Sequence, residues 1–363
     1  MGIGIIEPFD QYVGTGTGSL NLRSVWNLTD ISNSLTLALP IGLIHATGKA
    51  LRVTGSDASD ANGLRRPFSA ETEQLSMGFF FVAHVIPPLT YNIFQFLRAD
   101  AGRQFYITLL PTGQFGLVTN AGTTLGISGG DFLVEIGVPY HIAWTIDLSG
   151  GTGATSNFNL YVNGNPTPIL SVTNVDLTGQ STNKIGIFEL WGGRSDNILE
   201  GQQHQDFTVD HMVFLMDEIS IVPEVELTKL AADGDSVVAW TPLNGGTNTA
   251  EIDELPSDGD TTYNSSNTLN AEDLFTIENL PEIPDYIYAV SLMTVMRKEE
   301  SATRGVTSKL QIDAVKHDGT EKFLSLTHTF YWDHWKQNPE TAVDWVEGDF
   351  PLISGYELTT VGA

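Results

Sequence analysis

The feature that most constrains the fold is the stretch from Gly137 to Gly164, where apolar and polar residues alternate in two runs. A period of two is typical of half-buried β-strands, and the Gly- and Thr-rich segment 149–156 between the runs predicts a loop. The closing dipeptide Asn163-Gly164 suits the positive φ angles of a tight turn. We therefore predict an antiparallel hairpin whose core face consists of Tyr140, Ile142, Trp144, Phe158, Leu160 and Val162.

The rest of the chain repeats this short-strand pattern. Segment 75–86 is apolar on both faces, which predicts a strand buried in the centre of a sandwich. Further strands are expected at 92–98, 104–110, 114–119 and 184–190, with turn residues between them. Since no amphipathic helical repeat is visible, we predict an all-β chain of two antiparallel β-sandwich (jelly-roll) domains.

Composition shifts and turn residues predict three segments within the 363 residues. Residues 1–20 read as an N-terminal arm with a short strand and a Gly/Thr run, and residues 21–223 as the first sandwich. Pro223 marks the break before residues 224–363, where alternating runs predict a second sandwich. We expect this second domain to serve in attachment or oligomerisation.

The charge balance excludes several classes of function. With 44 acidic and 17 basic residues, the chain has a formal net charge of −27. Such a surface repels phosphate backbones, so we expect no nucleic-acid partner. The absence of cysteine excludes disulfides and thiolate chemistry. We also expect no secretory signal and no membrane insertion, because no apolar run approaches about 20 residues.

The first segment resembles the concanavalin A-like (laminin-G-like) lectin and glucanase sandwich. The motifs that carry this resemblance are Trp144-Thr145-Ile146, the run 160–164 (LYVNG) and a late strand at 217–221 (DEISI). Glucanases of this fold need two carboxylates at a defined separation. The run 251–256 (EIDELP) begins such a motif but places Pro256 where the second acid should stand. We therefore interpret it as a solvated acidic loop.

Two further motifs resemble tailed-phage virion proteins: the opening 7–12 (EPFDQY), and 338–341 (NPET) followed by Trp345. The resemblance implies a non-enzymatic structural protein on the virion surface, assembled in the host cytoplasm with copies of itself and other virion proteins. It would be a capsid decoration, turret or head-fibre protein, or a tail-fibre component. The alternatives are a lectin-like adhesin for host-surface polysaccharide and, less favoured, a glycan-degrading enzyme.

Three sets of candidate site residues follow from these hypotheses. Aromatic and cationic side chains for glycan binding are Tyr161, Trp191 and Arg194. Aromatic residues for subunit interfaces are Phe9, Tyr12, Trp332, Trp335 and Trp345. Lectin-type sandwiches often bind Ca²⁺, and the oxygen ligands here would be Asp57, Asp60 and Asn62. We expect no other cofactor, because the spacing of His204 and His211 matches no common zinc pattern, and we assign no catalytic residue.

Overall fold

The computed structural model divides into two compact units, unit 1 (Met1–Glu226) and unit 2 (Leu227–Ala363). It describes residues 2–7, 27–29, 35–38, 50–55, 63–151, 155–178, 183–191, 205–223, 228, 230–252, 260–281, 284, 286–287, 289–350 and 352–361. Within these residues the chain is all-β, apart from two short 3₁₀ turns, η1 (Thr249–Glu251) and η2 (Glu347–Asp349). The predicted fold class is thus confirmed.

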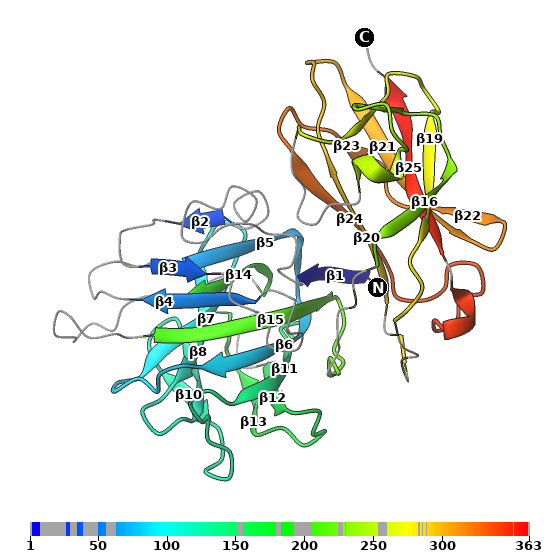
Figure 1. The fold of residues 1–363 in the computed structure, drawn as a ribbon. Coiled ribbons are helices and arrows are strands. Elements are labelled where there is room, and N and C mark those ends of the chain that lie inside the picture. The colour runs from blue at the N-terminus through cyan, green and yellow to red at the C-terminus, as the bar shows by residue number, and fades with distance from the viewer. Residues whose placement is uncertain are drawn as a thin grey trace. The chain divides into compact units, whose positions relative to one another are not determined.

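Unit 1 contains two antiparallel sheets (Figure 1). Sheet A is eight-stranded in the order β13 (Leu170–Val175), β12 (Ser156–Val162), β11 (Pro139–Asp147), β6 (Gln74–Ala83), β15 (Gln205–Met216), β4 (Leu51–Gly55) and β3 (Leu35–Ala38), with β1 (Gly2–Glu7) also paired to β15. Sheet B is seven-stranded in the order β10 (Thr124–Ile127), β9 (Phe115–Thr119), β8 (Arg103–Leu109), β7 (Tyr91–Leu97), β14 (Ile185–Trp191), β5 (Gly63–Thr72) and β2 (Asn27–Thr29).

The predicted hairpin supplies the centre of the core between these sheets. Strands β11 and β12 pair with Trp144 opposite Leu160, and all six side chains assigned to the core face are buried. The Trp144 ring lies 4.9 Å from Phe79 of β6 and 5.2 Å from Phe94 of β7, so it bridges the two sheets. Asn163 and Gly164 have φ angles of 51° and 68°, as the predicted turn requires.

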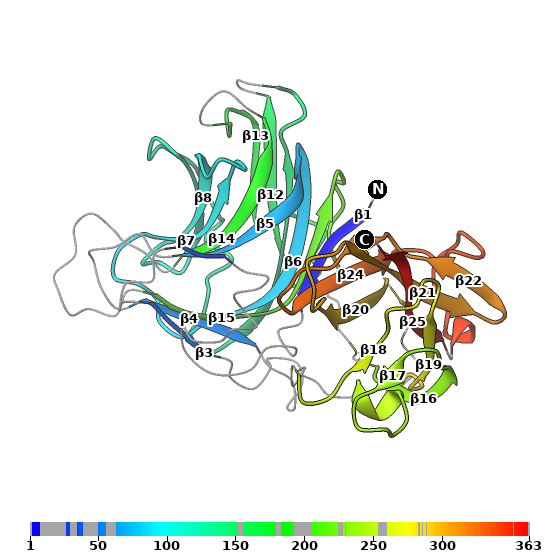
Figure 2. The ribbon, with the colours of Figure 1, turned by 90° about the horizontal axis from the view of Figure 1, so that it is seen from above.

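Strand β15 is the longest of sheet A and has several partners. It pairs with β6, with β4 through residues 205–209, and with β1 through residues 212–216 (Figures 1 and 2). The strand predicted within the N-terminal arm therefore exists, and it belongs to this chain's own sheet. β1 pairs with the part of β15 that extends beyond the residues paired with β4.

The late strand predicted at 217–221 is wrong. Asp217 has a φ of 55°, outside the extended region, and β15 ends at Met216. The hydroxyl of Thr72 donates to Asp217 Oδ1 at 2.8 Å, which stabilises this turn. The following residues lie on sheet A instead: Ser76 Oγ donates to the Glu218 carbonyl at 3.0 Å, and the Ser220 amide donates to Ser76 Oγ at 3.0 Å.

Unit 2 is built on a six-stranded sheet, here called the unit 2 sheet. Its order is β16 (Ala232–Val237), β19 (Glu272–Ile277), β25 (Ile353–Val361), β21 (Arg304–Ile312) and β22 (Val315–Asp318), with β23 (Lys322–Phe323) also paired to β21 (Figure 1). Two strand pairs complete the unit: β17 (Thr241–Pro242) with β18 (Asn264–Ser265), and β20 (Val290–Met296) with β24 (Thr329–Trp335) (Figure 2).

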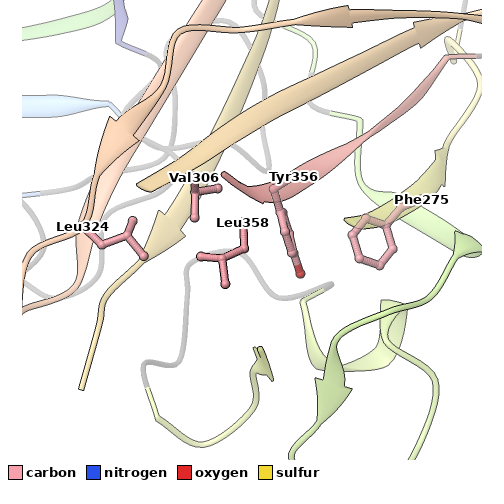
Figure 3. Packing of buried hydrophobic residues seen from close by; sticks show 5 residues of the cluster. All are labelled: Phe275, Val306, Leu324, Tyr356 and Leu358. Carbon is pink, nitrogen blue, oxygen red and sulfur yellow. The ribbon is translucent and has the colours of Figure 1, made fainter. Parts of the chain in front are cut away.

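The β20–β24 pair packs against the unit 2 sheet through two buried clusters. The first cluster consists of Phe275, Val306, Leu324, Tyr356 and Leu358 (Figure 3). Met296 and Tyr331 of the strand pair pack against it. The second contains Leu310, Ile312, Trp345 and Leu352, with Val290 and Trp335 packed against it. Each unit thus has its own core. No helix among the described residues is long and apolar enough to cross a membrane.

Candidate functional site

A row of polar side chains crosses the face of sheet B that points away from the core. Arg65 lies opposite Glu189, Glu189 opposite Gln95, and Gln95 opposite Tyr106 in the strand register. Directly paired residues share one face of a sheet. The neighbours of these residues along each strand, such as Phe94, Phe96 and Phe188, contact Trp144 in the core. The four polar side chains, here called the sheet B row, therefore point outward.

Burial and hydrogen bonding differ along the sheet B row. Arg65 Nε donates to Glu189 Oε1 at 2.7 Å. In this ion pair the Glu189 side chain has no exposed surface. Tyr106 donates its hydroxyl to Asn120 Oδ1 at 3.2 Å. Gln95 is fully buried, and neither its Oε1 nor its Nε2 has a hydrogen-bond partner among the described residues. An unpaired buried amide is costly, so Gln95 needs a partner that the described residues do not supply.

Basic residues of unit 1 collect on the same sheet. Among the described residues, Arg65, Arg66, Arg98, Arg103 and Lys184 lie on the strands of sheet B or directly beside their ends, while Arg52 lies on sheet A. Arg52 is held by Asp206, with its Nε 2.7 Å from Asp206 Oδ1. Among the described residues of unit 1, sheet B therefore carries most of the cations, of which Arg65 and Arg98 are already paired with Glu189 and Asp100.

The sheet B row combines an acid–base group with groups that bind a carboxylate. Hydrolysis by a carboxylate pair needs two acids, and the row contains one, Glu189, whose charge is balanced by Arg65. A phenol can transfer a proton when it is held within reach of the reacting atom. An amide with free donors can hold a developing negative charge. The arrangement therefore suits proton transfer next to a carboxylate better than hydrolysis.

Two of the three predicted glycan-binding residues lie within the described part of the chain. Tyr161 is half-buried on β12 of sheet A, opposite Ala143. Trp191 ends β14 and pairs with Gly63, so it lies on a strand of the row, and Arg194 lies outside the described residues. Tyr161 and Trp191 thus lie on different sheets, and the role of all three residues in binding stays a prediction.

The predicted interface residues are divided in the same way. Trp332 and Trp335 are half-buried on β24, and Trp332 stacks on His334 at 5.9 Å. Trp345 is 2% exposed, and its Nε1 donates to the Trp335 carbonyl at 2.8 Å, so it packs in the core of unit 2. Phe9 and Tyr12 lie outside the described residues, and so do the calcium candidates Asp57, Asp60 and Asn62.

The structure also describes part of the acidic run 251–256 and of the histidine-containing segment 204–211. The acidic loop is not solvated at its start: Glu251 is 4% exposed and accepts hydrogen bonds from the amide and side chain of Asn244 at 3.2 and 3.0 Å. Asp206, Asp210 and His211 are buried in β15. In the part of the chain that is described, no group of three acidic or histidine side chains could hold a metal ion.

The sheet B row escaped sequence reasoning because its members come from four strands that are not consecutive. The local signal was present: Gln95, Tyr106 and Glu189 each stand between two apolar residues of a predicted strand. One polar residue between two apolar residues is ordinary in any strand that has a solvated face, so each of the three by itself indicated no site. Only the strand order, in which β14 separates β5 from β7, shows that they form one row.

The fold defines an all-β sandwich class that known structures share. A glucuronan lyase from Trichoderma reesei matches with a TM-score of 0.40 and 15% identity over 56% of this chain and 94% of its own. Alginate lyase Aly36B matches with 0.38 and 14% over 59% and 96%. A sialidase matches with 0.38 and 15% over 53% of this chain and only 17% of its own. No family model and no curated protein matches the sequence.

These findings correct two expectations. The sandwich assigned to a non-enzymatic virion protein occurs in these solved structures in polysaccharide lyases and a sialidase, and none of the reported matches is a virion component. The expectations of a virion structural protein and of a chain without enzymatic activity are therefore wrong. The motifs at 7–12 and 338–345 were too short to specify a particle. At such low identity, the likeness describes the fold alone.

Proposed function

We propose that unit 1 cleaves an acidic polysaccharide by β-elimination at the sheet B row. The observation that carries this proposal is Gln95, a fully buried amide that has no hydrogen-bond partner among the described residues and lies in register between Glu189 and Tyr106. A uronate carboxylate would accept its Nε2–H. Because Arg65 balances the charge of Glu189, the row offers neutral donors to that carboxylate.

In the proposed reaction, Tyr106 is the acid–base group. The Tyr106 oxygen takes the proton from C5 of the uronate, the electron pair forms the C4–C5 double bond, and the C4–O bond to the leaving sugar breaks as the same hydroxyl gives its own proton to the leaving oxygen. The Gln95 amide stabilises the negative charge that develops on the carboxylate. A sugar would first meet Arg65 and Tyr106, whose exposed fractions are 22% for the side chain and 7% for the residue.

The names of the structural neighbours agree with this substrate class. Glucuronan and alginate, which appear in the titles of neighbouring lyases, are polymers of uronates. The proposal for this chain depends on the sheet B row and not on that agreement.

The test uses the full chain with sodium alginate, polyglucuronate and polygalacturonate as separate substrates. We expect at least one polymer to yield the ultraviolet-absorbing unsaturated uronate. Tyr106→Phe should lower kcat by about 100-fold or more, because proton transfer is lost while the fold is kept. The matched control is Tyr140→Phe, which removes a hydroxyl of the core of unit 1 that accepts from the Glu135 amide at 3.1 Å and should keep full activity. Absence of product from all three polymers, or full activity in Tyr106→Phe, would refute the proposal.

A further inference from the structure

Unit 2 contains a cavity that the sheet B row does not use. It has a volume of about 880 Å³ and is lined entirely by residues of unit 2, from the unit 2 sheet, strand β20 and the loops around β17 and β18. We call it the unit 2 cleft. Its size is that of a site for a small ligand or a short oligomer.

Aromatic side chains form one wall of the unit 2 cleft. The Trp240 and Tyr356 rings meet edge to face with centroids 4.7 Å apart, and Phe275 lies 5.8 Å from Tyr356. Figure 3 shows Tyr356 projecting from β25 between Phe275 and Leu358, with its hydroxyl at the tip. Rings of this kind provide apolar area together with a polar end, which suits a ligand that has both.

Polar atoms are placed beside these rings. Asn264 Nδ2 donates to the Asn248 carbonyl at 2.9 Å and to the Tyr356 hydroxyl at 3.4 Å. Asn264 Oδ1 is buried and has no partner among the described residues. Burial raises the pKa of Tyr356, so its hydroxyl keeps its hydrogen and can donate it. The pair thus offers one acceptor and one donor, which is what a sugar hydroxyl uses.

The wall is held in place before any ligand arrives. Asp273 Oδ1 accepts the amides of Ala239 and Trp240 at 2.7 and 2.8 Å, and Trp240 Nε1 donates to the Ala271 carbonyl at 3.0 Å. Asp273 has no exposed surface, so these charge-assisted bonds are shielded from water. Preorganisation of this kind lowers the entropy lost on binding.

Several of the charges that line the unit 2 cleft are paired with each other. Arg297 bonds to Asp260 through its Nε at 3.0 Å and also lies 3.3 Å from Glu299, while His328 Nε2 is 3.5 Å from Asp260 Oδ1. Lys298 Nζ is held by the Ala302 carbonyl at 2.8 Å, and the acidic chain disfavours an anionic ligand. A neutral ligand rich in hydroxyl groups is favoured.

We propose that the unit 2 cleft binds a neutral oligosaccharide, with one sugar ring against Trp240 and Tyr356 and its hydroxyls on Asn264 and Tyr356. This site is independent of the sheet B row: it requires no catalysis and takes a different class of sugar. It makes unit 2 a glycan-binding module whatever reaction unit 1 performs.

The test is calorimetry of the full chain with cellohexaose, laminarihexaose, mannohexaose and maltohexaose in turn. We expect saturable binding of at least one of them at one site per chain. Tyr356→Phe should weaken that binding about tenfold, because it removes one hydrogen bond from a desolvated site. The matched control is Tyr286→Phe, the same chemical change at a tyrosine of unit 2 that is 56% exposed and does not line the cleft.

Hydrogen exchange locates the site without any substitution. Protection by the bound hexasaccharide should fall on residues 239–241 and 263–266. Failure of all four sugars to bind, equal binding by Tyr356→Phe and the wild type, or protection confined to residues 1–226 would overturn the proposal. Because the readout is binding of neutral sugars, it does not depend on whether unit 1 cleaves uronates.

Discussion

At the scale of single residues, Gln95 and Gln104 form a natural comparison on sheet B. Both are glutamines with no exposed surface. Gln104 Nε2 donates to the Lys184 carbonyl, whereas neither polar atom of the Gln95 side chain has a partner among the described residues. The Gln104 amide is thus satisfied at its nitrogen and unpaired at its oxygen, whereas the Gln95 amide is unpaired at both atoms and is the less favourable of the two.

We expect Gln95→Leu to raise the free energy of unfolding by about 1–2 kcal/mol, because it removes an unpaired buried amide of similar volume. The same variant should lose uronate cleavage. Gln104→Leu is the control, and it should lower stability by about 1 kcal/mol. Urea denaturation measures both. A Gln95→Leu protein less stable than the wild type would show that the amide is already satisfied.

His141 gives unit 1 a dependence on pH. It is 2% exposed on sheet A, in register with Phe80, and Phe80 in turn lies opposite Asp210. Neither ring nitrogen has a partner among the described residues, and burial lowers the pKa of His141 to about 4. The folded protein therefore keeps this ring neutral at pH values where the unfolded chain protonates it.

We expect stability to fall as pH decreases from 6.5, the ordinary pKa of histidine, toward 4. The unfolded state binds the additional proton in this window, so the loss through His141 should reach about 3 kcal/mol near the lower end. Above the window this contribution should not change. Thermal unfolding of the wild type and His141→Phe at a series of pH values separates it from carboxylate titration. Parallel curves for the two proteins would contradict the assignment.

At the scale of elements, segment 218–222 is tied to the outer face of sheet A over a glycine. A Cβ atom at Gly78 would lie 2.6 Å from Val222 Cγ1, closer than the atoms can approach. Val222 has no exposed surface, so it has little room to move. The segment after Asp217, which the sequence predicted to be a strand, thus packs on sheet A at a position where only glycine fits beneath Val222.

We expect Gly78→Ala to lower the free energy of unfolding by about 1–3 kcal/mol through this overlap. Gly130→Ala is a matched control, since no atom lies within 4 Å of its Cβ position. Chemical denaturation gives the difference, and hydrogen exchange should show faster exchange at the Ser220 amide, which donates to Ser76. Equal stability of the two variants would mean that segment 218–222 can shift to admit the methyl group without a cost in free energy.

Individual elements could be read from the sequence where one face alternates. The hairpin around Trp144 and the apolar strand β6 follow directly from a period of two. The turn at Asp217 could not be read, because its cause is a contact with Thr72, far away in the chain. The same limit hid the sheet B row and the unit 2 cleft. Asn264 and Tyr356 lie on strands whose meeting depends on the whole of unit 2.

At the scale of the whole molecule, the net charge of −27 acts against the compact state. Raising NaCl from about 10 mM to about 150 mM shortens the Debye length from roughly 30 to 8 Å and screens this repulsion. We expect the melting temperature to rise by a few degrees. Differential scanning calorimetry in NaCl and KCl measures the effect, which should be equal for both salts. A melting temperature that falls with salt would show that attractive ion pairs dominate.

The pairing of β1 with β15 has a consequence for how the chain folds. Residues 2–7 are synthesised before the rest of unit 1, yet their partners at 212–216 are nearly the last of that unit. Closing so long a loop is entropically costly and slow, and it must wait until β15 has a sheet to join. Sheet A can therefore be completed only after nearly all of unit 1 has emerged from the ribosome. Until then its first strand must remain without its partner.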